Sequence, residues 1–457
     1  MKFIHTADWH LGNMMHDIDR TRETGAFLEW LKTEIGATGA EALIIAGDVF
    51  DVVNPSNAAK KQYYKFLASL LATKCSNVVV VGGNHDSGTL LDAPCEILEA
   101  LNIKVVGSIN NRNVDDLVVE LKNTQGDAIG ICCAVPFMRN LELEQFYKLH
   151  DEMCKSSESS ADGSDAASGD CVSDEDLLKR LYADVYRRAV ELRGDRDIPI
   201  IATGHLYASN LSGRESEEST ENRENGASSG SAYDAVPETS IDDGVREVIG
   251  TLGNVDVSTF PSELDYVALG HIHYTSMVDK NPKVFYSGSP FVMGFDEANC
   301  KRNVLVVEAL ANAVPTVEKV EVPKAMRFEQ FKGDLETLRK KLRNLEKELL
   351  ASPMETYVDL LLTSGDFVSL NDALESEEAG KHFVVKRHRI ARDVMRKGVS
   401  GFDDGVESTK QYSQEDYFRM LIASNVEQSE DSEQVKSLYD KFIGLFNEAI
   451  NKAHENV

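Results

Sequence analysis

Residues 2–10 read KFIHTADWH, an apolar run that ends in an aspartate and a histidine two positions apart. The same arrangement returns four times, each time with a hydrophobic run leading into a short polar motif. The later motifs are Gly47-Asp48, Gly83-Asn84-His85-Asp86, Gly204-His205 and Gly270-His271-Ile272-His273. The hydrophobic runs are typical of buried strands and cover residues 2–6, 42–46, 78–81, 198–203 and 266–269. Because ligands collect at the carboxyl ends of strands in α/β sheets, we expect the five motifs to meet at one rim.

Helical patterns lie between the first strands, at residues 20–35, 58–72 and 89–101. Alternation of strands and helices predicts βαβ units and a parallel sheet. Strand-like segments continue at residues 283–286, 303–308 and 316–320. The pattern therefore predicts one α/β domain over residues 1–322.

Two stretches inside this domain, 155–177 and 210–240, are rich in serine and acidic residues and almost lack large apolar ones. Chains of this composition bury too little apolar surface to become ordered. Candidate site residues lie on both sides of each stretch. We therefore interpret both as inserts within one domain rather than as domain boundaries.

A second region begins at Pro323. Leucines recur at helical spacing across residues 333–351, and strand-like runs follow at 357–362 and 382–385. These features predict a small α/β domain over residues 323–410. A Gly-, Asp- and Ser-rich linker then leads to two amphipathic patterns, at 413–425 and 431–453. We expect residues 411–457 to form helices that dock on a partner.

Composition limits the class of protein. The chain has 457 residues and a formal net charge of −28. This charge argues against a protein that coats nucleic acid unaided, but it allows a nuclease with a local basic surface. The seven cysteines form no C-x-x-C pair, and we expect them to be reduced, with Cys132 and Cys133 packed in a strand. No apolar run reaches the roughly 18 residues that span a membrane, and no signal peptide is visible, so we expect a cytoplasmic protein.

The five motifs carry the oxygen and imidazole ligands that divalent metal ions prefer. Two such ions about 3.5–4 Å apart can clamp a phosphate and activate a nucleophile. A carboxylate must bridge them, and Asp48 suits this role because Gly47 lets the backbone turn after the strand. The other ligand candidates are Asp8, His10, Asn84, His205, His271 and His273.

His85 follows the ligand candidate Asn84 and should face away from the same ion. A histidine beside a metal cluster can protonate a leaving oxygen or stabilise charge in the transition state. We expect Asp86 to orient the His85 ring. A single His or Asp at a strand end is usually an ordinary turn residue. Five such motifs, each after an apolar strand, favour a functional site.

At these residues the chain resembles the calcineurin-like metallophosphoesterase family, and within it the SbcD-type bacterial nuclease subunits. The resemblance is carried by residues 5–12, 46–51, 83–87, 202–206, 268–273, 287–290 and 295–297. It implies a four-layer α/β/β/α sandwich and two divalent ions, with Mn²⁺ preferred and Mg²⁺ as the alternative. It assigns one ion to Asp8, His10, Asp48 and His273. It assigns the other to Asp48, Asn84, His205 and His271, with His85 as the catalytic histidine.

The resemblance also implies partners. Nuclease subunits of this type pair with an SMC-like ATPase, SbcC, as a homodimer within a heterotetramer. Such complexes cut double-stranded DNA ends, hairpins and single strands. This chain contains no G-x-x-x-x-G-K-[ST] loop of its own, which agrees with that division of labour. The resemblance further places a DNA-capping domain after the phosphoesterase domain.

Two basic segments are candidates for DNA contact. Arg20 and Arg22 follow the first motif, although arginines exposed at helix starts are common without a ligand. Residues 381–397 form the one marked basic cluster, and a solvated charged face is the alternative interpretation there. The DNA-contacting candidates are Arg20, Arg387, Arg389 and Arg392.

The favoured function is a two-metal DNA phosphodiesterase that acts as the nuclease subunit of an ATPase-coupled complex. One alternative is a phosphomonoesterase or small-nucleotide phosphodiesterase with the same metal site, because one fold hosts many activities. The region 323–457 argues against it, since a small-molecule phosphatase needs no basic cap. Another alternative is a structural subunit that mainly positions DNA, against which the full ligand set argues.

Overall fold

The computed structural model describes residues 1–157, 174–209, 254–364 and 382–390. The chain divides into two compact units. The first comprises Met1–Gln330, Glu348–Asp359 and His382–Arg387. The second comprises Phe331–Lys347, Leu360–Lys381 and His388–Val457. The expected domain limits at 322/323 and 410/411 stay predictions, and the second of them lies outside the described residues.

The first sheet of the first unit has the strand order β16-β15-β1-β4-β5-β6. Strands β1, β4, β5 and β6 are parallel, while β15 and β16 complete one side in antiparallel pairing. The strands are β1 (Lys2–Thr6), β4 (Ala42–Ala46), β5 (Asn77–Val81), β6 (Ile103–Val106), β15 (Asn303–Glu308) and β16 (Thr316–Glu321). The parallel core and the three apolar runs at 2–6, 42–46 and 78–81 are as the sequence predicts.

The second sheet has the order β13-β14-β12-β9-β8-β7. Its central strands β14, β12, β9 and β8 are parallel, and its edge strands β13 and β7 are antiparallel. The strands are β7 (Val118–Lys122), β8 (Ala128–Cys133), β9 (Ile200–His205), β12 (Tyr266–Gly270), β13 (Ser276–Met277) and β14 (Val284–Tyr286). β9 runs two residues beyond the expected 198–203, so His205 is its last residue. Cys132 and Cys133 are buried in β8, as expected.

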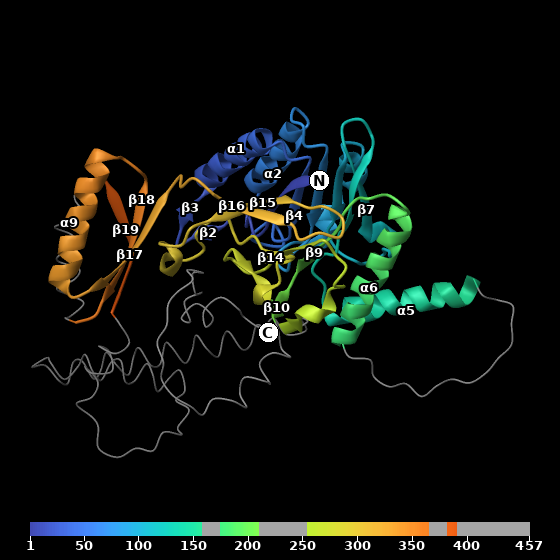
Figure 1. Ribbon diagram of the computed structural model, residues 1–457. Helices are drawn as coiled ribbons and strands as arrows, with labels where there is room; N and C mark the ends of the chain where they lie inside the picture. Colours follow the sequence, from blue (N-terminus) through green and yellow to red (C-terminus); the bar gives the residue numbers. More distant parts are fainter. Residues whose placement is uncertain (158–173, 210–253, 365–381, 391–457) are drawn as a thin grey trace, which may run out of the picture. The chain divides into compact units, whose positions relative to one another are not determined.

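The two sheets pack face to face and helices cover their outer sides (Figure 1). One core joins alternate residues of β1 and β4, such as Phe3 and Ile44, to Ile201 and Tyr266 of the second sheet. The other face of the first sheet, including Ile4 and Ile45, packs under α1 (Thr21–Thr38) and α2 (Asn57–Leu70). On the far side of the second sheet lies α6 (Asp174–Arg193), against which α5 (Asn140–Ser157) packs. The α/β/β/α sandwich is therefore confirmed.

Local sequence explains where the helices on the first sheet begin and end. Ser56 caps α2, because its side chain accepts a hydrogen bond from the amide of Ala59. Gly39 ends α1 with a φ of 68°, which a glycine adopts without strain. The single helix expected at 89–101 is wrong. Two short helices, α3 (Gly88–Asp92) and α4 (Cys95–Glu99), replace it, because Pro94 lacks the amide proton that a continuous helix needs.

The acidic segment 155–177 differs from the expectation at both of its ends. Residues 155–157 belong to α5, and residues 174–177 belong to α6. The acidic residues near its end thus lie in the first turn of a helix, where negative charge is favourable. Its centre, like the whole of 210–240, lies outside the described residues.

A third sheet follows with the order β17-β18-β19. Its strands are β17 (Arg327–Gly333), β18 (Thr356–Leu362) and β19 (Phe383–Ile390), and α9 (Leu335–Ala351) lies between the first two in sequence. Leu338, Leu342, Leu345 and Leu349 of α9 are buried, as their helical spacing predicts. The helices expected at 413–425 and 431–453 lie outside the described residues.

Candidate metal centre

The residues after the strand ends have unusual backbone conformations. Asp8, His10 and Asp48 have φ values of 54°, 43° and 49°, and His271 reaches 97°. Residues other than glycine rarely adopt positive φ, and such positions cluster where the surrounding structure holds a functional side chain in place. Backbone hydrogen bonds impose the conformation here. The amide of Asp8 donates to the Gly47 oxygen at 3.0 Å, and that of His10 donates to the Asp48 oxygen at 3.0 Å.

The glycines of the motifs allow the strand ends to approach closely. A Cβ atom on Gly270 would lie 1.9 Å from the Ala46 oxygen, which belongs to the opposite sheet. A Cβ on Gly47 would lie 2.1 Å from Nδ1 of His205, again across the two sheets. The motif glycines therefore let ligands of the two sheets share one pocket.

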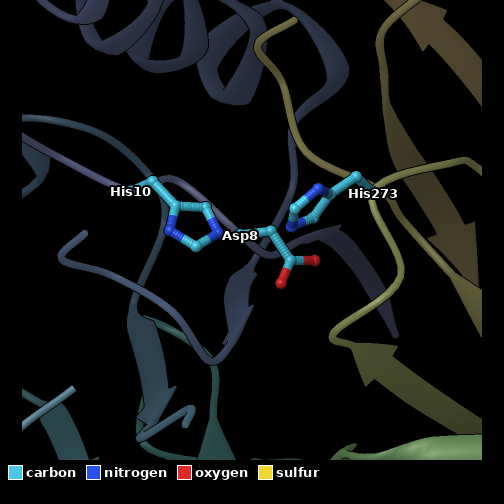
Figure 2. Close-up of side chains that lie close together, drawn as sticks. All are labelled: Asp8, His10 and His273. Carbon is cyan, nitrogen blue, oxygen red and sulfur yellow. The ribbon is translucent and has the colours of Figure 1, made fainter. Parts of the chain in front are cut away.

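Asp8, His10 and His273 form the first cluster, in which one ligand atom of each lies within 4.8 Å of the others. Figure 2 shows the two imidazole rings on either side of the Asp8 carboxylate. Asp8 and His10 are buried, and the His10 Nε2 atom also lies 3.6 Å from Oδ2 of Asp48. The spacing of Asp8 and His10 expected from the sequence thus brings them to one point, and His273 joins them from the second sheet.

A second cluster, which shares Asp8, contains Asp48 and His205. The Nε2 atom of His205 lies 3.3 Å from Oδ2 of Asp48 and 3.0 Å from Oδ1 of Asn84. The Nδ1 atom of His271 lies 3.1 Å from the same Asn84 oxygen. The Nδ1–H of His205 donates to the Ala46 oxygen, so Nε2 is the nitrogen that faces the ligands. All seven ligand candidates therefore meet at one rim, with Asp48 between the two clusters.

Electrostatics in this pocket reflect buried charges held close together. Burial raises the pKa of Asp8 to about 7. Burial also acts on Asp48, but the attraction of His205 and His10 outweighs it and holds the pKa of Asp48 below its usual range. Burial opposes a charged ring on His205, yet Asp48 raises the pKa of His205 to about 9. Burial and nearby histidines lower the pKa of His271 to about 4 and that of His273 to about 3.

The donor set fits divalent cations. Both ring nitrogens of His10 are buried without a hydrogen-bond partner, which costs free energy unless another group satisfies them. Carboxylate oxygen, amide oxygen and neutral imidazole are the ligands that first-row divalent ions take. The imidazoles of His10 and His205 lie beside the buried Asp48 carboxylate, and a cation between the ligands would balance its charge.

The structure places His85 and Asp86 differently from each other. His85 is exposed at the mouth of the pocket, in an open hollow with Asn84 and residues 51–54. Its Nδ1–H donates to the backbone carbonyl oxygen of Asp51 at 2.8 Å. The Asp86 carboxylate instead accepts from the backbone amides of Val49, Phe50 and Gly83, at 3.0, 2.9 and 3.0 Å respectively.

These contacts correct the role expected for Asp86. Its carboxylate holds the Asp48 loop against the Asn84 loop. The Nδ1–H of His85 donates to residue 51 and not to Asp86. The backbone carbonyl oxygen of Asp51 has the orienting role expected of the Asp86 carboxylate. The Asp51 side chain faces another ring. Its Oδ1 atom lies 3.4 Å from Nδ1 of His10. Because the acceptor for His85 is a backbone atom, the type of residue at position 51 gives no sequence signal for this role.

Arg20 is another correction. Its side chain is only 2% exposed and pairs with Glu23 at 2.7 Å. Its Nη1 donates to the Val292 oxygen at 2.7 Å. A guanidinium enclosed in this way is not available to a DNA phosphate, whereas the side chain of Arg22 is 80% exposed. Arg387 and Arg389 are half-buried on β19, two residues apart and so on one face of the strand, and Arg392 lies outside the described residues.

The comparison with protein families agrees with this fold and site. Residues 1–275 match the family model described as calcineurin-like phosphoesterase. The matched segment contains all seven ligand candidates and His85. The chain therefore belongs to the calcineurin-like phosphoesterase family, whose divalent-metal chemistry agrees with the donor set of this pocket.

Among curated relatives, the chain is similar to the SbcD subunit of the nuclease SbcCD from Escherichia coli K12, with 30% identity over 369 residues, covering 80% of this chain and 79% of the relative. The protein of the same name in Rhodobacter capsulatus is 29% identical, over 69% of this chain and 68% of the relative. That of Bacillus subtilis is 26% identical, over 70% and 69% respectively. Across the described parts of the chain, the helices are all too short or too polar to cross a bilayer.

Proposed function

We propose that this chain is a metal-dependent nuclease that hydrolyses phosphodiester bonds in DNA, as the nuclease subunit of an SbcCD-type complex. One observation carries the proposal: five strand ends from two sheets bring seven oxygen and imidazole ligand candidates to one rim, linked to one another by short contacts. The relatives named as nuclease subunits support the substrate class, because they match at least two thirds of the chain.

The proposed cofactors are two divalent ions, Mn²⁺ by preference and Mg²⁺ as the alternative. Asp8, His10 and His273 would hold one ion, and Asn84, His205 and His271 the other, with Asp48 bridging. The position of Asp48 supports this count, because its Oδ2 lies 3.6 Å from Nε2 of His10 and 3.3 Å from Nε2 of His205. When bound, such ions supply a nucleophile at neutral pH and stabilise the charge on the phosphate.

The chain's own residues would orient the reaction and move a proton. The hydrogen bond from Nδ1–H of His85 to the Asp51 oxygen leaves Nε2 as the atom open to the pocket mouth. A ring protonated at Nε2 can give its proton to the departing sugar oxygen, which is general acid catalysis. The Asp86 carboxylate keeps this loop against the Asp48 loop, so the distance between His85 and the ligands is set by backbone contacts.

Partners follow from the same proposal. The relatives carry the name of one subunit of the nuclease SbcCD, which supports pairing with the ATPase subunit SbcC. A homodimer within a heterotetramer is the proposed assembly. Double-stranded ends, hairpins and single strands are the proposed DNA substrates. Arg387 and Arg389, which share one face of β19, are the proposed phosphate contacts. Residues 411–457 are the proposed docking segment.

Cleavage of circular single-stranded DNA by the purified full chain with Mn²⁺ tests the function. A circle has no ends, so nicking reports endonuclease chemistry, and Asp48→Asn provides the matched variant with the ligand charge removed. We expect nicking by the wild type and none by the variant. Hydrolysis of p-nitrophenyl phosphate esters without any cleavage of DNA, even after the ATPase subunit is added, would reject the nuclease and favour the small-substrate phosphoesterase.

A further inference from the structure

The metal-ligand candidate His273 is held by its backbone oxygen. Nη1 of Arg302 donates to this oxygen at 2.7 Å, and the amide of Ser289 donates to it at 3.2 Å. Gly288, with a φ of 76°, lets the chain pass close by, because a Cβ there would lie 2.9 Å from the same oxygen. The side chain of Arg302 is only 5% exposed. A buried arginine thus fixes the residue that joins the first ligand cluster from the second sheet.

Arg302 is itself held by a buried partner. Its Nη2 lies 2.5 Å from Oε2 of Glu297, in the short 3₁₀ helix η5 (Phe295–Glu297). The same Glu297 oxygen accepts the amide of Met293 at 2.8 Å. The pair therefore links the His273 loop to residues 292–293. Because guanidinium nitrogens point in fixed directions, one arginine can satisfy the carboxylate and the carbonyl together.

A second buried pair reaches the same stretch from the first sheet. Nη1 of Arg20 donates to the Val292 oxygen at 2.7 Å and lies 3.4 Å from Oδ1 of Asn13. The side-chain nitrogen Nδ2 of Asn13 donates to Oδ1 of Asp51 at 2.9 Å. That aspartate oxygen lies 3.4 Å from Nδ1 of His10. The network that starts at His273 thus ends at His10, the other imidazole of the first cluster.

We propose that Arg302, supported by Glu297, is a positioning residue for the first of the two metal sites. Together with the Arg20–Asn13–Asp51 contacts it forms one polar network, buried at the two arginines and half-buried at Asn13 and Asp51, which sets the separation of the His273 and His10 imidazoles. The second site does not depend on this network, because His205 is oriented by the Ala46 oxygen. Groups that orient metal ligands without touching the metal typically change affinity by about 10- to 100-fold when removed.

The inference rests on the proposed metal centre, and counting bound Mn²⁺ tests both separately. Electron paramagnetic resonance of free Mn²⁺ during titration gives the stoichiometry and both affinities for the full chain, without any assay of activity. The variants are Arg302→Gln and Arg302→Lys. The control is Lys301→Gln, which removes the neighbouring exposed cation that pairs with Glu321. Circular dichroism confirms that each variant is folded.

We expect wild type and Lys301→Gln to bind two ions alike. Arg302→Gln should lower the affinity for one ion by about 10- to 100-fold and leave the affinity for the other unchanged. Arg302→Lys should weaken the same ion less, because an ammonium keeps the charge but lacks the fork of donors. If Arg302→Gln does not fold, Arg302→Lys decides alone. Wild-type affinities in a folded Arg302 variant, or equal weakening of both ions, would overturn the inference. A wild type that binds no Mn²⁺ would instead reject the metal centre itself.

Discussion

The two sheets of the sandwich contribute different chemistry to the same rim. The first sheet supplies both carboxylates and the amide, from Asp8, Asp48 and Asn84, together with the imidazole of His10. The second sheet supplies only imidazoles, from the three residues His205, His271 and His273. The carboxylates therefore sit on one side of the pocket, and imidazoles face them from the other.

The two sides are also held in place differently. On the first sheet the ligand loops hold each other, through amide-to-carbonyl bonds and through the Asp86 carboxylate. On the second sheet the ligands depend on contacts that cross to other elements, such as the Ala46 oxygen for His205 and Arg302 for His273. The comparison teaches that the first-sheet loops are held mainly by each other, with one bond across the pocket from the amide of His271 to the Asp8 carboxylate. The second-sheet ligands are held in place only where the sheets face each other.

Replacing the shared carboxylate should have the largest effect. Asp48→Asn keeps the shape of the side chain but removes the charge that lies beside His10 and His205. We expect loss of both ions and a fall in DNA nicking of more than about 100-fold. His271→Gln, on the side that supplies only imidazoles, should weaken the binding of one ion. Mn²⁺ titration of the two variants measures the difference, and equal losses from both would break the comparison between the sheets.

The exposed histidine should separate metal binding from catalysis. His85→Gln removes the group that can protonate the leaving oxygen but leaves every ligand in place. We expect both ions to bind as in the wild type, while nicking falls by about 10²- to 10⁴-fold. The measurement is Mn²⁺ stoichiometry beside the nicking rate. Unchanged activity would remove His85 from the mechanism.

The close approach of the two sheets can be tested without metal. Gly270→Ala places a Cβ 1.9 Å from the Ala46 oxygen of the first sheet, so the strands must separate. We expect a loss of about 1–3 kcal/mol in the free energy of unfolding, as for other overpacked sites. Urea denaturation of the metal-free chain measures it.

Gly36→Ala is the control for that substitution. Gly36 lies within α1, and nothing stands within 4 Å of the Cβ that alanine would add. The change should stabilise the protein by up to about 1 kcal/mol, because alanine favours a helix over glycine. A Gly270→Ala variant as stable as the wild type would show that the two sheets can accommodate the added Cβ atom without loss of packing.

The smallest expected effect is a pH dependence at His5. Its Nε2–H donates to the Leu269 oxygen, and its Nδ1 accepts from the Tyr266 hydroxyl, so it joins the sheets as a neutral ring. Burial lowers the pKa of His5 to about 3 in the folded state, from an ordinary value of 6.5. Below pH 6.5 the unfolded chain binds a proton at His5 that the folded chain does not. The free energy of unfolding therefore decreases as the pH is lowered from 6.5 to about 3.

At pH 5.5 the loss in the free energy of unfolding that His5 causes is about 1.4 kcal/mol relative to neutral pH. Urea denaturation at pH 7.5 and 5.5 measures the difference in the wild type and in His5→Asn. The variant lacks the titrating ring, so its loss between the two pH values should be smaller by that amount. An identical pH dependence in both proteins would show that His5 is not the cause.

Much of this architecture can be predicted from local sequence. The apolar runs before Asp8, Asp48 and Asn84 are strands, and the convergence of their polar ends follows from parallel pairing. The departures from expectation have local causes. Pro94 divides one expected helix into two, and helix formation at Asp174 takes over the end of an acidic segment. The spacing of a motif does not tell which atom its side chain will contact. The backbone oxygen of Asp51 therefore has the orienting role that was expected of Asp86.

The chain by itself determined which residues could bind metal, because ligand chemistry and strand periodicity are properties of short segments. Only the tertiary structure decided how they are used. It enclosed Arg20 beside Glu23 although Arg22, two residues later, remained exposed. It also joined His10 to His273 through contacts between residues far apart in the chain, such as Arg20 with Val292. Such contacts depend on which faces of the two sheets meet, and no local pattern in the sequence encodes that.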